Sequence, residues 1–498
     1  MMIPMHRSRE TLASVASAGQ SQTRQRRGPT LVHLAVLLAL SVPNALAELP
    51  NFVVIFADDL GYGDLGVYGS ETIRTPNLDR MAAEGMRFTD FYTAAPFCSP
   101  SRAALLTGRY PVRAGVPYVL FPTELTGLPP AEITIAEILS DKGYATAAIG
   151  KWHLGWPKPF RAQRHGFDFF YGLPYSNDML KWESDTVLRP QHAFWRLPLL
   201  DNDEIAEAPV NQHTLTRRYT ERAVEFIEAN RARPFLLYLP HTFPHNPQYA
   251  SEDFEGRSPH GLYADTVEEM DWSVGEVLRT LRELGLDEKT LVVFTSDNGP
   301  TRGGGRWGKR SAGGSAGGLR GNKGTTFEGG MREPGIFWWP GKVAAKTQTS
   351  EPASILDLLP TLAELAGADT PSDRVIDGRS IADLLLGKTE GFSQEPFFYY
   401  FGMQLQAVRL GNWKLFLRHS EPHEQSASLW YLQNPELYER HHRLREEAEL
   451  YDLDADRAES RNLASERPEI VERLDGIARR FDESMRREKR HPVYLDGQ

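Results

Sequence analysis

The stretch Phe52-Val-Val-Ile-Phe-Ala-Asp-Asp59 contains the two features that decide the fold, an apolar run and a pair of carboxylates directly after it. The run lacks polar alternation, which is typical of a strand covered on both faces of a sheet. Three other runs have the same character: Ala145–Ile149, Phe235–Leu239 and Leu291–Thr295. Helical patterns separate them, at about 75–85, 134–143, 211–230 and 264–284. This alternation predicts an α/β fold in which helices flank a large, mixed and mostly parallel sheet.

A different pattern begins near Phe392. Phe397–Phe401 and Ala407–Leu417 have the composition of strands, and Gly411-Asn412 places a turn inside the second stretch. A charged amphipathic helix is predicted at about 468–487. We therefore expect an N-terminal domain over residues 48–391 and a small C-terminal α+β subdomain with an antiparallel sheet over residues 392–498.

The first 47 residues have the organisation of an export signal. Basic residues at 24, 26 and 27 precede the apolar stretch Leu31–Val42, and Ala45-Leu46-Ala47 forms an A-x-A cleavage site. The stretch is short for a membrane span, so an uncleaved anchor is the weaker alternative. The chain contains no Asn-x-Ser/Thr acceptor site, which favours a bacterial protein exported to the periplasm or the medium. No later apolar run approaches membrane length, so we expect no stable membrane span after cleavage.

Composition excludes several classes of function. The 498 residues carry 56 basic and 66 acidic side chains, a formal charge of −10, so nothing indicates a nucleic-acid partner. Cys98 is the only cysteine in the chain. An intramolecular disulfide and a cysteine-rich zinc or iron–sulfur site are therefore excluded.

Polar side chains follow each of the four predicted strands. The pairs are Asp58 with Asp59, Lys151 with His153, His241 with His245, and Asp297 with Asn298. Because open α/β sheets bind ligands beyond the carboxyl ends of their strands, four such pairs at one edge predict an active site. The carboxylates and the Asn298 amide are hard oxygen donors that suit Ca²⁺ or Mg²⁺. Each pair taken alone is equally consistent with turn and cap chemistry.

Cys98 lies in Pro96-Phe-Cys-Ser-Pro-Ser-Arg102, a loop that leads into a predicted helix with Pro100 as its first residue. The free N–H groups at a helix N-terminus favour an anion, and Arg102 adds a positive charge one turn later. A lone cysteine is ordinarily a buried small hydrophobic residue. A thiolate nucleophile paired with a histidine is the other interpretation that these residues leave open.

The stretch Cys98-Ser-Pro-Ser-Arg102 matches the C-x-P-x-R signature of the type I, formylglycine-dependent sulfatases, and Thr107-Gly-Arg109 extends it. The chain resembles this family along nearly its whole length, and the arylsulfatases and N-acetylgalactosamine-6-sulfatases most of all. Further matching stretches are Val54–Asp64, Gly150–Gly155, Phe294–Pro300, Gly321–Pro334, Glu449–Leu453 and Asn462-Leu463. The resemblance implies an alkaline-phosphatase-like fold and makes residues 48–391 the catalytic domain.

The resemblance also implies a metal centre. Cys98 would be converted to formylglycine (3-oxoalanine), and Arg102 would hold its hydrate. The modified side chain would bind Ca²⁺, in preference to Mg²⁺, together with four oxygen donors: Asp58, Asp59, Asp297 and Asn298. A formylglycine-generating enzyme or an anaerobic sulfatase-maturing enzyme would then be a partner during biosynthesis.

Roles in binding sulfate follow from the same resemblance. Lys151 and Lys323 would bind sulfate oxygens, and Ser176 resembles a further sulfate contact. His153 would contact the formylglycine hydroxyl. Either His241 or His245 would contact the bridging ester oxygen. His245 is favoured because it precedes a proline by two residues, as the family's histidine does, whereas His241 does not.

The implied reaction is hydrolysis of the sulfate ester of a carbohydrate or of an aryl sulfate. The hydrate would attack sulfur, His245 or Lys323 would protonate the leaving alcohol, and His153 would deprotonate the second hydroxyl to expel sulfate. Two alternatives remain: a phosphatase or phosphonate monoester hydrolase of the alkaline phosphatase superfamily, and a catalytically silent sugar-binding protein if Cys98 stays a thiol. We expect the loops 155–211 and 303–321 to determine substrate specificity. Four basic residues lie in or next to the second loop: Arg302, Arg306, Lys309 and Arg310.

Overall fold

A computed structural model describes residues 49–179, 196–304, 308–388, 395–419 and 445–495. The predicted signal peptide, residues 1–47, lies outside the described residues. Within the described ranges, no helix has the length and the apolar character that a membrane crossing requires.

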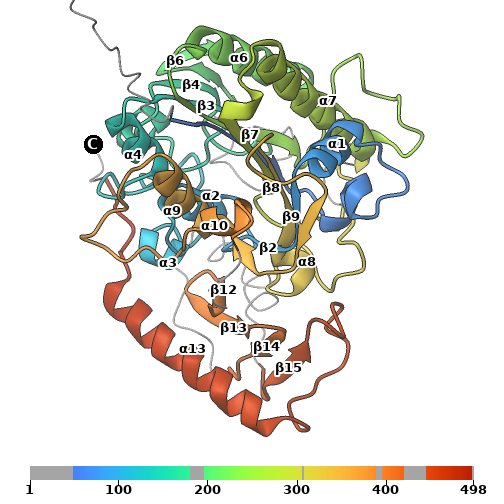
Figure 1. The fold of residues 1–498 in the computed structure, drawn as a ribbon, viewed down its shortest axis with the longest axis vertical. Coiled ribbons are helices and arrows are strands. Elements are labelled where there is room, and N and C mark those ends of the chain that lie inside the picture. The colour runs from blue at the N-terminus through green and yellow to red at the C-terminus, as the bar shows by residue number, and fades with distance from the viewer. Residues whose placement is uncertain (1–48, 180–195, 305–307, 389–394, 420–444, 496–498) are drawn as a thin grey trace, which may run out of the picture. The chain divides into compact units, whose positions relative to one another are not determined.

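The centre of the structure is a sheet of eleven described strands (Figure 1). Its order is β10-β2-β9-β8-β1-β7-β3-β4-β5-β6, and β11 pairs with β2. The four predicted strands are its neighbouring central members: β8 Thr290–Ser296, β1 Asn51–Asp58, β7 Phe235–Pro244 and β3 Ala145–Lys151. All pairings among these four are parallel, with Val54 opposite Val293 on one side and Tyr238 on the other.

Antiparallel strands make the sheet mixed, as expected. β9 pairs antiparallel with both β8 and β2, and β5 pairs antiparallel with β4 and β6. The bounds of the remaining strands are β2 Met86–Tyr92, β4 Phe169–Leu173, β5 Leu199–Asp201, β6 Glu204–Glu207, β9 Arg332–Trp338, β10 Thr347–Thr349 and β11 Ala353–Ser354.

Apolar side chains cover both faces of the sheet. Along β1, Phe52, Val54 and Phe56 belong to one buried cluster, and Val53 and Ile55 belong to the other. The second cluster lies under α1 Pro76–Glu84, α6 Leu215–Asn230 and α7 Leu262–Glu283. The first lies under α2 Cys98–Thr107, α3 Pro111–Ala114, α4 Ile135–Asp141, α9 Leu358–Leu365 and α10 Ala382–Leu385. Burial on both faces explains why the central strands are continuously apolar.

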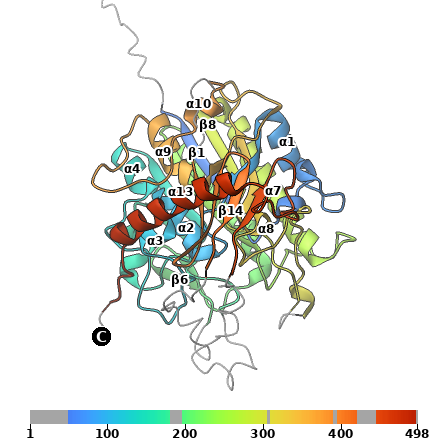
Figure 2. The same ribbon diagram turned by 90° about the horizontal axis from the view of Figure 1, so that it is seen from below.

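The C-terminal region forms its own antiparallel sheet, β12-β13-β14-β15. Its strands are Phe397–Phe401, Gln404–Leu410, Trp413–Phe416 and Glu449–Asp452. Gly411, with φ of 61°, makes the predicted turn between β13 and β14. The long helix α13, Pro468–Glu488, lies across this sheet (Figure 2), and its Phe481 ring stacks on Phe398 at 3.6 Å between centroids. The predicted fold class is therefore confirmed, while the division at residue 391 stays a prediction.

Candidate active site

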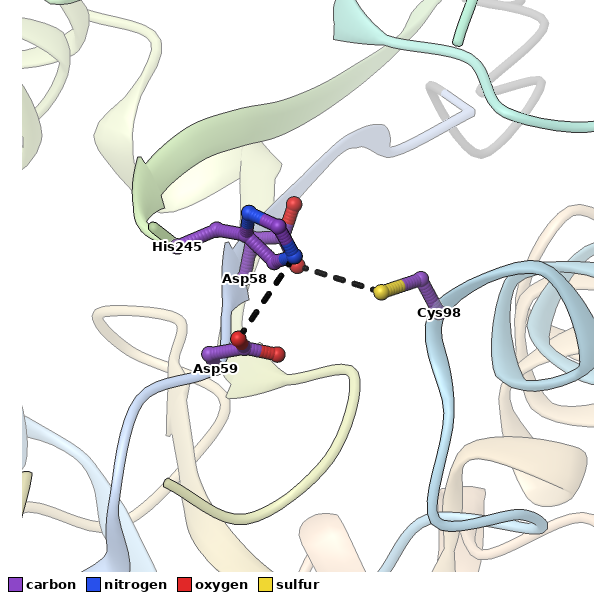
Figure 3. A group of neighbouring side chains, drawn as sticks. All are labelled: Asp58, Asp59, Cys98 and His245. Atoms are coloured by element: carbon purple, nitrogen blue, oxygen red, sulfur yellow. Dashed lines mark hydrogen bonds and ion pairs between the residues drawn. The ribbon is translucent and has the colours of Figure 1, made fainter. Parts of the chain in front are cut away.

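The carboxyl ends of the four central strands meet at one edge of the sheet and bring the predicted polar residues together. Asp58 ends β1, Lys151 ends β3, His245 directly follows β7, and Asp297 directly follows β8. All four side chains are buried. Figure 3 shows Cys98 and His245 directed toward the carboxylates that follow β1.

Cys98 is the first residue of α2, and Phe97 caps the helix in an extended conformation. The prediction that Pro100 opens the helix was therefore wrong by two residues. Proline is tolerated as the third residue, because the first N–H groups of a helix have no partner within it. The Cys98 thiol is 3% exposed, and its Sγ lies 3.5 Å from Asp58 Oδ1. Burial raises the pKa of the thiol above its ordinary value, and Lys151 and Lys323 oppose this effect.

Arg102 joins α2 to two strands of the sheet. Its guanidinium is fully buried and donates to the Lys151 carbonyl at 2.7 Å and to Asp297 Oδ2 at 2.8 Å. A second carboxylate, Asp58, lies 3.4 Å away. Because two ends of one planar group are held by different strands, the position of Cys98 one turn earlier is fixed relative to the carboxylates.

Asp59 is at the centre of the polar contacts. Its φ of 64° is uncommon for a residue with a side chain, and the turn that it makes aims its N–H at Asp297 Oδ1, 3.1 Å away. Its Oδ1 accepts from Lys323 at 2.5 Å and from the Asn298 amide at 2.8 Å. Its Oδ2 has no hydrogen-bond partner, although it is buried, and the same is true of Asn298 Oδ1.

Two lysines contact the carboxylates of the site. Lys151 Nζ donates to Asp58 Oδ2 at 2.5 Å and to Ser176 Oγ at 3.1 Å. Lys323 Nζ lies 3.4 Å from Cys98 Sγ, in addition to its bond with Asp59. The two ammonium groups and the Ser176 hydroxyl therefore lie around the space in front of Cys98.

The structure separates the two histidines that the sequence left as alternatives. His245 Nε2 lies 3.7 Å from Asp59 Oδ2, and its Nδ1 is 2.9 Å from Asn177 Oδ1. His241 instead contacts Ser273 of α7 at 3.4 Å, and burial lowers its pKa to about 4. Only His245 is therefore grouped with Asp58, Asp59 and Cys98, whose ligand atoms all lie within 4.8 Å of one another.

His153 contacts a backbone carbonyl through one ring nitrogen and leaves the other without a partner. Its Nε2 lies 2.9 Å from the Leu120 carbonyl, and its buried Nδ1 has no partner. Burial and the neighbouring Lys151 and Arg102 hold the pKa of His153 well below its usual range, so the imidazole is neutral. A carbonyl contact makes Nε2 the donor, which leaves Nδ1 as an acceptor.

The charges of the site favour a further cation. Burial would raise the pKa of Asp58, but Lys151, His245 and Arg102 outweigh it and hold the pKa well below its usual range. For Asp297, burial and repulsion from Asp58 prevail over Arg102 and raise the pKa to about 7. Three carboxylates are thus packed so closely that one resists ionisation, and a divalent cation relieves that repulsion.

The donor set fits a hard cation. The two buried oxygens without a partner, Asp59 Oδ2 and Asn298 Oδ1, are the type of ligand that Ca²⁺ takes, and the Asp58 and Asp297 carboxylates lie beside them. His245 is the one nitrogen in the group. Of the expected ligands, Asp58, Asp59 and Cys98 belong to this group and Asp297 does not, so the full ligand set stays a prediction.

One neighbour was missed by sequence reasoning. Asn177 is fully buried and orients His245, while its Nδ2 donates to Gln212 at 3.0 Å and to the Pro247 carbonyl at 2.9 Å. The residue stands directly after Ser176, which the sequence did single out. No local signal distinguishes it, because its partners are 35 to 70 residues away in the chain.

Comparisons with known proteins place the chain in a family. The family model "Sulfatase" matches residues 50–368, and a model described as the C-terminal region of aryl-sulfatase matches residues 393–493. Arylsulfatase A of Homo sapiens is 42% identical over 463 residues, which are 88% of this chain and 89% of the relative. N-acetylgalactosamine-6-sulfatase of Mus musculus is 44% identical over 401 residues, 77% of this chain and 75% of the relative.

Solved structures show the same fold. The PsFucS1 sulfatase from Pseudoalteromonas sp. superposes with a TM-score of 0.77 at 26% identity, covering 90% of this chain and 92% of that one. Ps i-CgsB in complex with k-i-k-neocarrahexaose gives 0.73 at 28% identity, covering 91% and 96%. The phosphonate monoester hydrolase of Agrobacterium radiobacter, at 18% identity and a TM-score of 0.59 over 90% of this chain and all of that one, shares the fold alone.

Proposed function

The chain belongs to the sulfatase family of sulfate-ester hydrolases, and we propose that it removes sulfate from a sulfated saccharide, using a formylglycine made from Cys98 and a bound Ca²⁺. The observation that carries the proposal is the grouping of Cys98 with Asp58, Asp59 and Lys323 at one sheet edge. A structural thiol needs none of these charged neighbours. The oligosaccharide complex of Ps i-CgsB supports a saccharide substrate.

The lysines bind the sulfate group in this proposal. A sulfate ester is anionic and resists attack, so the charge on its nonbridging oxygens must be neutralised. Lys151 and Lys323 supply two ammonium groups beside Cys98, and the Ser176 hydroxyl already bonded to Lys151 adds a third donor. These groups are held by Asp58 and Asp59 before substrate arrives, so little reorganisation is needed.

The metal would be held by Asp58, Asp59, Asp297, Asn298 and the modified side chain at position 98. A bound Ca²⁺ would supply a fixed positive charge at the sulfate group, and the aldehyde hydrate would supply the attacking hydroxyl and a second hydroxyl on the same carbon. Arg102, locked between two strands, keeps position 98 aimed at this group of oxygens.

Protons move through the histidines and Lys323. His245, kept in place by Asn177, or Lys323 protonates the alcohol that leaves. Burial lowers the pKa of His245 and the neighbouring Asp59 opposes this, so His245 can act as the acid only while Asp59 keeps it protonated. His153 offers Nδ1 as a neutral acceptor for the proton of the second hydroxyl.

Two measurements test the function. Mass spectrometry of the Cys98 peptide, from protein made together with a formylglycine-generating or anaerobic maturing enzyme, should show loss of the sulfur atom. The same protein should hydrolyse nitrophenyl sulfate far faster than nitrophenyl phosphate. A retained thiol points to the silent sugar-binding alternative, and faster phosphate hydrolysis points to the phosphatase alternative. Export to the periplasm or medium is part of the proposal and is tested by locating the processed chain in cell fractions.

A further inference from the structure

A cavity of about 340 Å³ opens beside Lys323. Lys323, whose ammonium group lies 3.4 Å from Cys98 Sγ, is one of the residues that line this cavity, so the cavity and the candidate active site share a residue. Its walls are Arg302, Arg320, Gly321, Asn322, Lys323, Gly324, Thr325, Thr326, Phe327, Gln406 and Arg445. We call it the arginine pocket.

Cations dominate the arginine pocket. Three arginines and Lys323 line it, and none of its lining residues is a carboxylate. Lys323 is paired with Asp59, and Arg445 has Glu449 at 3.6 Å. Among the described residues, no carboxylate lies within ion-pair distance of Arg302 or Arg320. Arg302 donates to the Asn322 side-chain oxygen at 2.7 Å, and Arg320 donates to the Tyr451 hydroxyl and the Glu459 carbonyl.

Two of the three guanidinium groups of the pocket, those of Arg320 and Arg445, are held in place by aromatic rings. Arg320 stacks over Phe327 at 4.0 Å, and Arg445 stacks over Phe416 at 4.0 Å and also faces Phe327 at 5.4 Å. Arg445 is only 11% exposed; burial lowers its pKa, Glu449 opposes this, and Arg320 repels it. An anion between the two arginines removes that repulsion without moving either group.

Carboxylates line a neighbouring hollow and do not line the arginine pocket. Glu446, Glu447 and Glu449 line a separate hollow that shares Arg320, Phe327 and Arg445 with the arginine pocket. On the side that continues from the sulfate site, the neutral polar groups are amides and hydroxyls, among them Asn322 and Gln406. Such groups bond sugar hydroxyls, whereas the one aromatic wall, Phe327, offers little to a large apolar alcohol.

We propose that the arginine pocket is a subsite for a second anionic group of the substrate, a carboxylate or a sulfate on the part of the saccharide next to the scissile ester. The inference deepens the proposed function, on which it rests: the preferred substrate is an acidic saccharide rather than a neutral sulfated sugar or a simple aryl sulfate. Arg302 is exposed and has no carboxylate partner in the described chain, so it is the residue that discriminates between charged and neutral saccharides.

Binding tests the subsite without relying on turnover. In the full chain with Cys98→Ala, which cannot form formylglycine, three disaccharides are titrated by calorimetry. They carry the same sulfate ester and, on the neighbouring sugar, a uronate, the uronate reduced to its alcohol, or a second sulfate. We expect each charged disaccharide to bind at least about tenfold more tightly than the neutral one, about 1.4 kcal/mol. Adding Arg302→Gln should abolish most of this preference.

The matched control is Arg473→Gln, which removes the same charge from the exposed face of α13 and should leave the preference unchanged. Equal affinity for all three disaccharides, or a preference that survives Arg302→Gln, overturns the inference. The ratio of the affinities for the two charged disaccharides shows whether the subsite prefers a carboxylate or a sulfate. Nitrophenyl sulfate hydrolysis by the matured wild-type protein reports on the proposed function separately, since that substrate has no second anion.

Discussion

Replacing Lys414 by methionine should destabilise the protein. Lys414 lies on β14, is fully buried, and its Nζ contacts Glu328 at 2.8 Å, Glu459 at 2.9 Å and the Thr326 carbonyl at 2.8 Å. It thereby joins the C-terminal sheet to the segment that follows Lys323. Methionine keeps most of the volume and removes the charge.

The expected loss of stability comes from the carboxylate that the substitution leaves without its ion pair. Glu328 keeps Arg332 at 2.6 Å, but Glu459 loses its one ion pair within the described residues. Breaking a buried pair so that a charge is stranded costs about 3–5 kcal/mol. With an unfolding entropy of about 2 cal/mol/K per residue, roughly 4 kcal/mol corresponds to about 4 °C in Tm for a chain of this length.

The loss should depend on pH. Burial already raises the pKa of Glu459, and Lys414 opposes this, so removing Lys414 raises it further. Because a raised pKa makes ionisation unfavourable in the folded state, the loss of stability is full above the raised pKa and shrinks as the pH falls through it toward the pKa of the unfolded chain.

Thermal unfolding of wild type, Lys414→Met and the exposed control Lys388→Met measures the effect at pH 8 and pH 5.5. Adding Glu459→Gln to Lys414→Met should recover most of the loss, because the stranded charge is gone. A Lys414→Met protein that melts within one degree (~1 °C) of wild type at pH 8, or one with the same deficit at both pH values, refutes the reasoning.

Three further predictions concern the site itself. Cys98→Ser has one hydroxyl in place of two, so it should accumulate a covalent sulfate ester on treatment with substrate; intact mass shows the adduct, and steady turnover without one contradicts the mechanism. Chelation and dialysis should lower both activity and Tm, and Ca²⁺ at about 100 times its Kd should restore about 2.7 kcal/mol; an unchanged melting curve rejects the metal assignment. Asn177→Ala removes the hydrogen bond that holds His245 and should lower kcat/KM by about tenfold, the equivalent of one lost hydrogen bond. The control Asn230→Ala, at the end of α6, should keep the activity of the wild type. Equal activity of the two variants would show that Asn177 does not position His245 for catalysis.

The central strands could be predicted because they are apolar without interruption and are covered on both faces. β2 and β9 were missed for the opposite reason. Arg87, Thr89 and Asp90 interrupt the apolar run of β2, and Pro334-Gly335 stands inside β9, where such residues ordinarily argue against a strand. Their pairing across more than two hundred residues leaves no local periodicity to detect.

The sequence predicted a set of site residues but not how their side chains are arranged. Polar pairs at strand ends and the motif around Cys98 identified the residues, because strand ends converge in any parallel sheet. The bond from Arg102 to Asp297, the orientation of His245 by Asn177, and the burial of Lys414 depend on contacts between distant segments. A polar residue inside a strand is usually exposed, so nothing local marked Lys414 as buried.

The burial of α2 sets an order of events during biosynthesis. Every residue from Cys98 to Thr107 is buried once the helix is docked, so an oxidising enzyme cannot bind the segment around the thiol in the folded protein. If Cys98 is converted as proposed, conversion would therefore have to precede collapse of the chain, and its extent would be set by a competition between the modifying enzyme and folding. Conditions or substitutions that delay docking of α2 should yield a larger converted fraction, and rapid overproduction should leave a mixture of oxidised and unconverted molecules that refolding alone cannot correct.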